Sequence, residues 1–286
     1  MGFATVRTIV KDTVIVIWDR LQAAEMPIPD HDKWTSIADK FFARCDFPLC
    51  IGALDGKHVK IKAPPNSGSK YFNYKGHHAV VLMAIADADC KFIVIDMGAY
   101  ESNSDGGIIQ DSAFYKLLNS NNLNIPEPTF IPGTNTTVPF VFVADEAFPL
   151  SPNMMRPFPR RELTDEKRIF NYRLSNARRQ VECAFGILSS MWRILLGTIE
   201  VHDTFACDIV KAVCVLHNMI LNKEEERIPF ISNDELAVEA RTRNNDLPAC
   251  NRRPGNEAMI IRDKFMSYFV PPLGKITDGP SLHREC

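Results

Sequence analysis

The chain has 286 residues, of which 45% are hydrophobic and 24% charged, and its 33 Lys and Arg against 35 Asp and Glu give a formal net charge of -2. This composition excludes disordered and collagen-like chains, and the near-neutral charge excludes a uniformly basic protein that coats DNA. No stretch approaches about 18 uninterrupted apolar residues, and the start of the chain lacks the apolar core of a signal peptide. We therefore expect no membrane partner and a protein of the nucleus or the cytoplasm.

The first half of the chain opens with helical spacing and then changes to strand patterns. Apolar residues at every third or fourth position predict a helix over residues 1–23, and a second helix is expected over 33–45. Segments 50–62, 77–86 and 91–97 are rich in Val, Ile and Leu. They predict the three strands of an antiparallel meander.

The second half places one further strand among helices. Residues 110–118 predict a short helix, and 119–138 form a loop dense in Asn, Pro and Thr. The near-continuous apolar run 138–144 predicts a strand that is buried on both faces. Further helices are expected from Thr164 onward, over 202–222 and over 256–268.

This order of elements predicts an α/β fold. We expect a mixed sheet of three antiparallel strands and a fourth strand that lies parallel beside the first, flanked by helices, with an N-terminal helical segment. The expected division is a helical segment at 1–48, a central domain at 49–222 and a C-terminal tail of helix and loop at 223–286.

The cysteines do not form a recognisable metal or redox motif. All eight stand singly, without the C-x-x-C spacing of a zinc ribbon or a thioredoxin-type site. Cys207, Cys214 and His217 are close in sequence, but they recur at the spacing of one helix face. We therefore interpret them as reduced core residues.

Three carboxylates stand where their charge needs a partner. Asp55 lies among apolar residues of the first strand, where an ionised carboxylate is costly unless it is paired or binds a cation. Asp145 ends the fourth strand, at the edge where open α/β sheets carry their sites, so the two aspartates approach across about 5 Å if the strands are neighbours. Glu182 flanks the apolar stripe of the long helix and can project toward the same edge. Such a set of oxygen ligands suits Mg²⁺.

A simpler interpretation of the same carboxylates stays open. Asp55 precedes Gly56, and an Asp before a Gly is often a turn residue. Glu182 can pair with Arg178 or Arg179 at helical spacing on a solvated face. Spacing alone does not decide between metal ligands and these structural roles.

Several motifs resemble one known family. The segments are GALDGKHV at 52–59, VFVADEAFPL at 141–150, NYRL at 171–174, RRQVECAFGIL at 178–188, LHN at 216–218 and the loop that runs from 98 to 112. Together and in this order they resemble the signatures of the PIF/Harbinger transposase-derived nucleases. The match runs from about Cys50 to Asn222.

The resemblance implies a fold, an activity and partners. It implies an RNase H-like core of a DDE endonuclease, in which Asp55, Asp145 and Glu182 fall on the catalytic triad and hold Mg²⁺ or Mn²⁺. Two such ions would activate a water or a DNA 3′-hydroxyl and stabilise the leaving oxygen of a phosphodiester. It also implies a DNA substrate, a nuclear location and a separate Myb-like DNA-binding partner. A second copy of the chain, in a homo-oligomer, is a further candidate partner.

Two stretches around the proposed site are basic although the whole chain is not. Residues 56–86 hold five Lys and three His without an acid, and 156–193 hold nine Lys or Arg against four acids. We expect them to form a positive surface for a phosphate backbone, with an ordinary solvated helix face as the alternative for the second stretch. The expected DNA contacts are Lys57, Lys60, Lys70, Lys75, Arg173, Arg178 and Arg179.

The chain also departs from the family pattern. Phe3 to Leu21 resembles only the last helix of the helix-turn-helix region that family members carry, so we interpret 1–48 as a remnant of that region and the chain as truncated. Glu101 stands where the family more often has Gly. The alternative function is therefore a domesticated, catalytically silent protein that binds DNA or the Myb-like partner.

Overall fold

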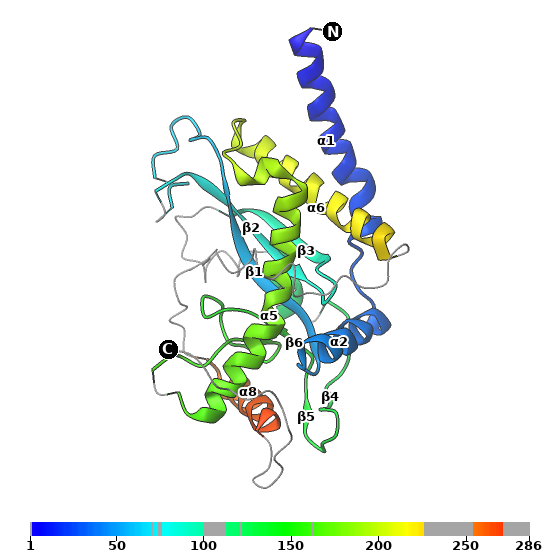
Figure 1. Ribbon diagram of the computed structural model, residues 1–286, viewed down its shortest axis with the longest axis vertical. Helices are drawn as coiled ribbons and strands as arrows, with labels where there is room; N and C mark the ends of the chain where they lie inside the picture. The colour runs from blue at the N-terminus through cyan, green and yellow to red at the C-terminus, as the bar shows by residue number, and fades with distance from the viewer. Residues whose placement is uncertain are drawn as a thin grey trace.

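The computed structural model shows a central sheet with helices around it (Figure 1). It describes residues 2–69, 71–73, 76–99, 113–120, 122–161, 163–225 and 254–270. The loop from 100 to 112, which contains Glu101, lies outside the described residues, as do Lys70 and Lys75.

The sheet has five strands in the order β3-β2-β1-β6-β7. The long strands β1 (Cys50–Lys60), β2 (Ala79–Ala86) and β3 (Phe92–Ala99) pair antiparallel, as the sequence predicts. The short strand β6 (Val141–Val143) lies parallel to β1, and β7 (Met154–Met155) lies parallel to β6. The expected mixed sheet, with the later strand beside the first, is confirmed.

The predicted fourth strand is shorter than its apolar run, which is a correction. Residues 138–144 do not form one strand, because Val138 pairs with Thr129 in a separate two-stranded sheet of β4 (Thr129–Phe130) and β5 (Thr137–Val138). Pro139 follows at once, and proline has no backbone N–H to donate to a ladder. The chain therefore leaves the small sheet before it joins the large one as β6.

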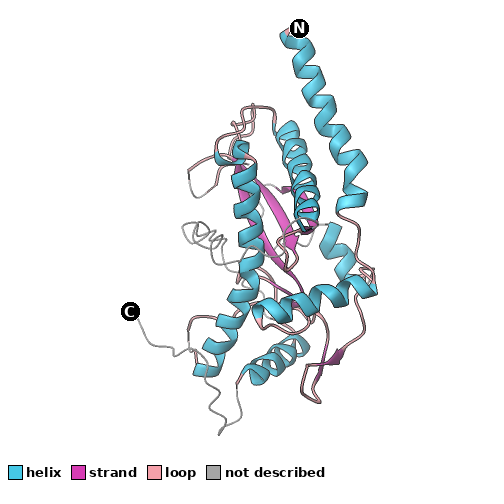
Figure 2. Cartoon of the chain, turned by 45° about the vertical axis from the view of Figure 1, so that its right-hand side comes forward, coloured by secondary structure: helices cyan, strands magenta, loops and turns pink. Residues whose placement is uncertain are grey.

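Helices lie on both sides of this sheet (Figure 2). The long α5 (Asp165–Met191) packs on β1, and α2 (His31–Cys45) packs on the start of the same strand. Helix α6 (Asp203–Glu225) contacts β3, and the short α4 (Ala113–Asn119) contacts it as well. The 3-10 turn η1 (Arg193–Leu196) follows α5, and α8 (Asn256–Phe269) packs against α5. All of the predicted helices are present, and the proposed domain boundaries stay a prediction.

The long helix begins where its sequence predicts. The Thr164 side chain accepts a hydrogen bond from the backbone N–H of Lys167 at 3.5 Å and so caps the first turn of α5. The expected apolar stripe is buried, and it consists of Leu174, Ala177, Val181, Ala184, Phe185 and Leu188. The side chains beside this stripe therefore lie near the sheet that α5 covers.

Helix α1 (Phe3–Glu25) differs from the others in its exposure. In this helix, which the structure describes in full, no residue is buried, and its N-terminal half extends away from the other elements (Figure 1). Its C-terminal half packs against α6, where Trp18 and Leu21 contact the core. The helix itself is confirmed, while its origin in a helix-turn-helix region stays a prediction.

The apolar composition of α6 is explained by its packing within the fold. Among the described residues, Asp203–Lys223 is long and apolar enough to cross a membrane by length and composition, with a mean hydropathy of 1.5. This helix lies against α1 and β3. Cys214 and His217 are buried and Cys207 is half-buried, as expected for core residues. The apolar side chains of α6 are therefore accounted for by contacts within the fold.

Candidate active site

Two aspartates lie side by side at the carboxyl end of β6. The parallel register pairs Ala53 of β1 with Val143 of β6. Asp55 and Asp145 are each two residues further along, and side chains alternate with a period of two, so both continue the same row on one face. The sheet thus brings together the two carboxylates that the sequence places 90 residues apart.

Asp55 is a buried carboxylate. Asp55 is only 1% exposed, and its Oδ1 accepts a hydrogen bond from the backbone N–H of Gly56 at 2.8 Å. Burial raises the pKa of Asp55 to about 7, and the nearby Asp145 and Glu182 carboxylates also raise it, whereas the Arg178 guanidinium lowers it. Asp55 therefore ionises readily only where a cation is close.

Asp145 is fixed by its own turn. Its Oδ1 accepts a hydrogen bond from the backbone N–H of Ala147 at 2.9 Å, which is the geometry of an Asx turn. Arg156, which follows β7, donates to the carbonyl oxygen of Phe148 at 3.2 Å and so holds the loop after Asp145. The second oxygen of Asp145, Oδ2, faces Arg178 of α5.

Arg178 connects the sheet carboxylates with the helix carboxylate. Arg178 and Glu182 are four residues apart on α5 and form an ion pair. The same guanidinium has its Nη1 3.7 Å from Asp145 Oδ2. Burial works to lower the pKa of Arg178, but the charges of Asp55, Glu182 and Asp145 more than offset this, and the pKa lies above its usual value. Arg178 is therefore a permanent cation among three carboxylates.

The donor set suits a divalent cation in its chemistry. Asp55, Asp145 and Glu182 offer carboxylate oxygens, which Mg²⁺ and Mn²⁺ prefer. Within the described part of the chain, no group of three His, Cys, Asp or Glu lies closely enough to hold a metal ion. The three carboxylates nevertheless act on one guanidinium, so they already surround a cation. As arranged here the set holds the Arg178 guanidinium, and a metal ion would need Arg178 to release the carboxylate oxygens.

The basic residues named from the sequence divide into two groups. Lys57 is 8% exposed and its Nζ lies 5.8 Å from the ring centroid of Phe185, so it is part of the packing between β1 and α5. Arg173 forms an ion pair with Asp46 after α2, with 2.6 Å between Nη1 and Oδ2. The Lys57 side chain therefore contacts the ring of Phe185, and the Arg173 side chain is engaged by Asp46.

The remaining basic residues lie closer to solvent. Lys60 ends β1 and is exposed, and Arg179 is half-buried on α5. The charge of Arg179 acts on the thiols of Cys45 and Cys183. Arg178 forms an ion pair with Glu182 and faces Asp145, so this predicted DNA contact lies with the triad carboxylates.

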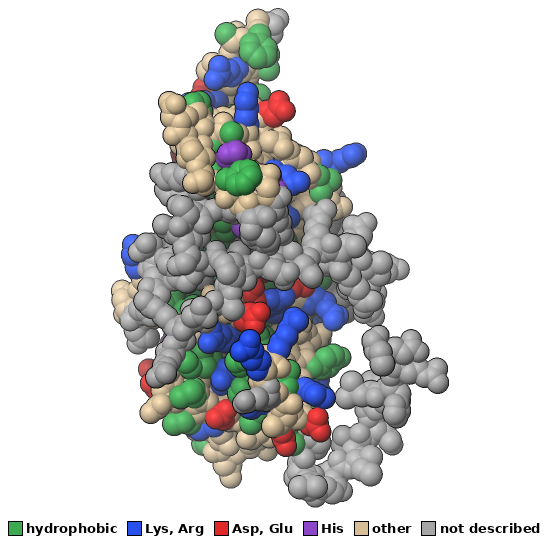
Figure 3. Space-filling view, turned by 90° about the vertical axis from the view of Figure 1, so that its left-hand side faces the viewer, with side chains coloured by type: hydrophobic (Ala, Val, Ile, Leu, Met, Phe, Trp, Pro, Cys, Tyr) green, Lys and Arg blue, Asp and Glu red, His purple; other side chains and the backbone are tan. Residues whose placement is uncertain are grey.

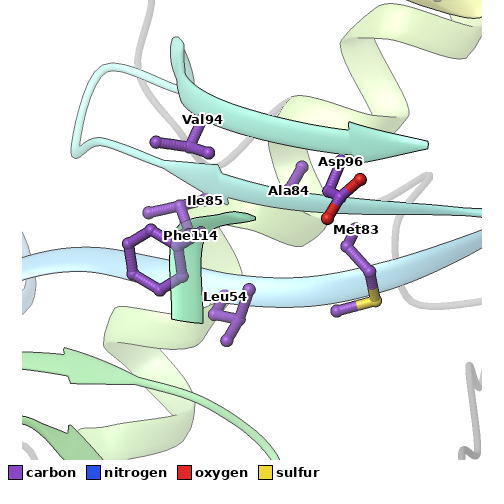
Figure 4. Close-up of a pocket in the computed structure, with 7 residues that line it drawn as sticks. All are labelled: Leu54, Met83, Ala84, Ile85, Val94, Asp96 and Phe114. Carbon is purple, nitrogen blue, oxygen red and sulfur yellow. The ribbon is translucent and has the colours of Figure 1, made fainter. Parts of the chain in front are cut away.

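An apolar pocket lies on the opposite face of the sheet (Figure 4). Leu54, Ile85 and Val94 line it as one cross-strand row, and Phe114 of α4 closes one side. Because side chains alternate along β1, Leu54 points away from the face that carries Asp55. Among the described residues that line it, Asp96 is the one with a charged side chain, and the others are apolar.

Some residues that support the site were not singled out from the sequence. Arg156 gave no signal, because its role depends on the small strand β7 that aligns it with the loop after Asp145. Asn171 holds Phe158 with two hydrogen bonds of 2.7 and 3.0 Å, and it lies in the NYRL segment. The NYRL segment indicates the family, but it does not predict this contact.

The LHN segment has a structural role. The Asn218 side chain bonds to both the N–H and the carbonyl oxygen of Phe92 at 2.8 Å, and it donates to the Glu25 carbonyl oxygen at 2.9 Å. His217 Nε2 lies 2.9 Å from the carbonyl oxygen of Cys90, and burial lowers the pKa of His217 to about 4. The hydrogen bonds of neutral His217 and of Asn218 hold α6 against the β2–β3 turn, the start of β3 and the end of α1.

The family model of the DDE superfamily endonucleases matches residues 54–218, and the chain belongs to this family. The matched range contains Asp55, Asp145 and Glu182 as well as the LHN segment. The resemblance that the motifs carry is thereby confirmed, and the mixed sheet flanked by helices is consistent with the RNase H-like fold of a DDE endonuclease.

Curated relatives agree with this assignment. "Protein ALP1-like" from Arabidopsis thaliana is 26% identical over 226 residues, which cover 74% of this chain and 54% of the relative. "Putative nuclease HARBI1" from Mus musculus is 26% identical over 190 residues, covering 65% of this chain and 50% of the relative. The chain therefore spans about half the length of the relatives it matches. No solved structure shows significant similarity to it.

Proposed function

We propose that the protein is a metal-dependent DNA endonuclease of the Harbinger transposase type. The observation that carries the proposal is the convergence of Asp55, Asp145 and Glu182 on one cation at the carboxyl end of β6. Membership of the DDE superfamily endonucleases supports it, as does the word nuclease in the names of several relatives. A nuclear location belongs to the same proposal.

The residues of the site have separate roles in this proposal. Asp55, Asp145 and Glu182 would hold Mg²⁺ or Mn²⁺. Two bound ions would lower the pKa of water or a DNA 3′-hydroxyl and stabilise the leaving oxygen of the phosphodiester. The Asx turn of Asp145 and the Arg156 contact behind it keep this carboxylate aimed at the site before a ligand arrives. Such fixed orientation reduces the reorganisation that the reaction requires.

The DNA backbone would lie on the face that carries the triad. On the face shown in Figure 3, several Lys and Arg side chains lie beside and below a small group of acidic side chains. Arg160 and Arg161, which follow β7, are exposed, and so is Lys60 at the end of β1. Phosphates are attracted to such basic side chains, while the acidic group admits them only with a cation present.

The experiment is cleavage of supercoiled plasmid DNA in Mg²⁺ or Mn²⁺. We expect nicking that EDTA abolishes, and a loss on the order of 100-fold or more in Asp55→Asn, Asp145→Asn and Glu182→Gln, since each removes one charged ligand worth several kcal/mol. Asp96→Asn is the matched control, because Asp96 is a carboxylate of the same sheet that lines the pocket on the opposite face.

The outcome for the control decides the interpretation. Asp96→Asn should cut as the unchanged protein does, and all four variants should keep a cooperative melting transition. If folded Asp55→Asn and Glu182→Gln nick DNA as fast as the unchanged protein, the triad is not the active site.

A second candidate is a domesticated protein that binds DNA without cleaving it. The observation that favours it is Arg178, which already neutralises the carboxylates that a metal would need. This candidate predicts DNA binding that EDTA leaves unchanged, together with no nicking in any divalent metal. The plasmid assay and a binding assay on the same preparation therefore separate the two functions.

A further inference from the structure

The Arg178 guanidinium occupies the centre of the triad. Its Nη2 pairs with Glu182 Oε1 and its Nη1 lies 3.7 Å from Asp145 Oδ2, while its charge also acts on Asp55. The side chain is only 23% exposed, and the Asp145 side chain is 11% exposed. The contact with Asp145 is therefore largely shielded from water, whereas the Glu182 side chain is 34% exposed.

Three ionised carboxylates that converge in a shielded place are unfavourable without a cation. Like charges at short range repel, and buried carboxylates without a partner are strongly unfavourable. Arg178 offers several N–H groups in a fixed fork, so one side chain can serve carboxylates from both α5 and the β6 edge. In the described residues, it is the side chain that bridges Asp145 and Glu182.

Arg178 and a metal ion would draw on the same carboxylates. Glu182 Oε1 and Asp145 Oδ2 face the guanidinium, and a divalent ion would take these lone pairs. A guanidinium and a divalent ion in one shielded cluster would also repel each other. Metal binding to these carboxylates and their present ion pairs with Arg178 therefore oppose each other.

We infer that Arg178 is a built-in counter-cation that keeps the triad assembled without metal and competes with the metal ion for it. When a metal ion binds, the guanidinium leaves the carboxylates and becomes free to face the phosphate that the metal recruits. Arg178 is thus a positioning residue that makes metal binding weaker but keeps the carboxylates in place. This inference rests on the proposed metal site of the triad.

The neighbouring arginine provides a matched control. Arg179 is the next residue on α5 and is also half-buried. Its charge acts on Cys45 and Cys183 rather than through an ion pair with the triad. Arg179→Gln removes the same charge from the same helix turn, so it measures the general effect of one positive charge on metal affinity.

The test compares Mn²⁺ binding and melting of the unchanged protein with Arg178→Gln and Arg179→Gln. In EDTA, Arg178→Gln should melt at a lower temperature than Arg179→Gln, because three carboxylates lose their counter-cation. Mn²⁺ titrated by electron paramagnetic resonance should bind Arg178→Gln about tenfold more tightly than Arg179→Gln, as expected for removal of a competitor. Saturating Mn²⁺ should then bring Arg178→Gln back toward the melting temperature of the metal-bound unchanged protein.

Each other outcome has a defined meaning. If Mn²⁺ binds all three proteins with one affinity, or binds Arg178→Gln more weakly, the competition is refuted while the metal site stands. If none of them binds Mn²⁺, both the metal site and this inference fall. If Arg178→Gln does not fold, Arg178→Lys is used, since it keeps the charge but lacks the fork that reaches two carboxylates. Arg178→Lys should then bind Mn²⁺ more tightly than the unchanged protein. An equal Mn²⁺ affinity would refute the inference.

Discussion

Asp55 shows how a single side chain can be unfavourable for folding and still belong to the site. It lies on a central strand with an apolar neighbour on either side, and it is almost fully buried. Its charge is compensated from α5 rather than from its own strand. Functional sites are where local rules of folding are broken and offset elsewhere.

The raised pKa of Asp55 predicts how stability changes with pH. Its pKa is about 7 in the folded chain and 3.8 in the unfolded chain, so the folded state binds more protons between these values. The contribution of Asp55 to stability is therefore complete below about pH 4 and is lost as the pH rises through about 7. Without metal, Asp55→Asn should gain stability relative to the unchanged protein by on the order of 2 kcal/mol between pH 5 and pH 8.

Urea denaturation in EDTA at pH 5 and pH 8 measures this difference. Glu166→Gln serves as the control, because a hydrogen bond from Thr164 lowers the pKa of Glu166 and its contribution is lost only as the pH falls toward that lowered pKa. Its effect should be equal at the two pH values. A gap between Asp55→Asn and the unchanged protein that stays constant would show that Asp55 is already ionised at pH 5.

The sequence predicts the members of the acidic cluster but not the way they meet. Burial of Asp55 and the place of Asp145 after a strand follow from local patterns. The pairing of Glu182 with Arg178 also follows, because it needs only helical spacing. The contact of Arg178 with Asp145 depends on how α5 crosses the sheet, and no local pattern carries that information.

At the scale of elements, strand length decides what the sequence can predict. The strands β1, β2 and β3 have eight or more residues and show clear apolar patterns, and all three were expected. The strands β4, β5 and β7 have two residues each, which is too short for a period to be visible. The run 138–144 was expected as one strand because hydrophobicity does not show that Val138 pairs elsewhere.

The pairing of β1 with β2 and β6 predicts that a substitution at Gly52 destabilises the fold. A Cβ atom there would lie 2.6 Å from Ile85 Cγ2 and 3.0 Å from Phe142 Cδ1. Both contacts are buried side chains in neighbouring strands, so Gly52→Ala should destabilise the fold by about 1–3 kcal/mol through overpacking. The midpoint of urea unfolding, followed by circular dichroism, gives this value.

Gly186 provides the comparison within the same protein. It lies inside α5, and a Cβ atom at this position would meet nothing within 4 Å. Since alanine is favoured over glycine in a helix by about 1 kcal/mol, Gly186→Ala should leave stability unchanged or increase it. Equal losses in the two variants would mean that the approach of the strands at Gly52 is not tight.

At the scale of the whole molecule, a net charge of -2 is compatible with a local positive surface. Several arginines and lysines lie beside and below the acidic group on one face (Figure 3). The total charge excludes a uniformly basic protein but not a nucleic-acid substrate, because the distribution of charge decides association with phosphate. This distribution follows only in part from the sequence, since Lys57 and Arg173 lie in basic stretches yet are taken up by contacts within the fold.

The triad as a metal site is tested most directly by a crystal structure of the protein soaked in Mn²⁺, with anomalous diffraction to locate the ion. We predict a peak ligated by Asp55 and Asp145, with Glu182 nearby and the Arg178 guanidinium displaced from the carboxylates. The contrary result is a crystal at saturating Mn²⁺ without a peak at this place, in which Arg178 still pairs with Glu182 and Asp145.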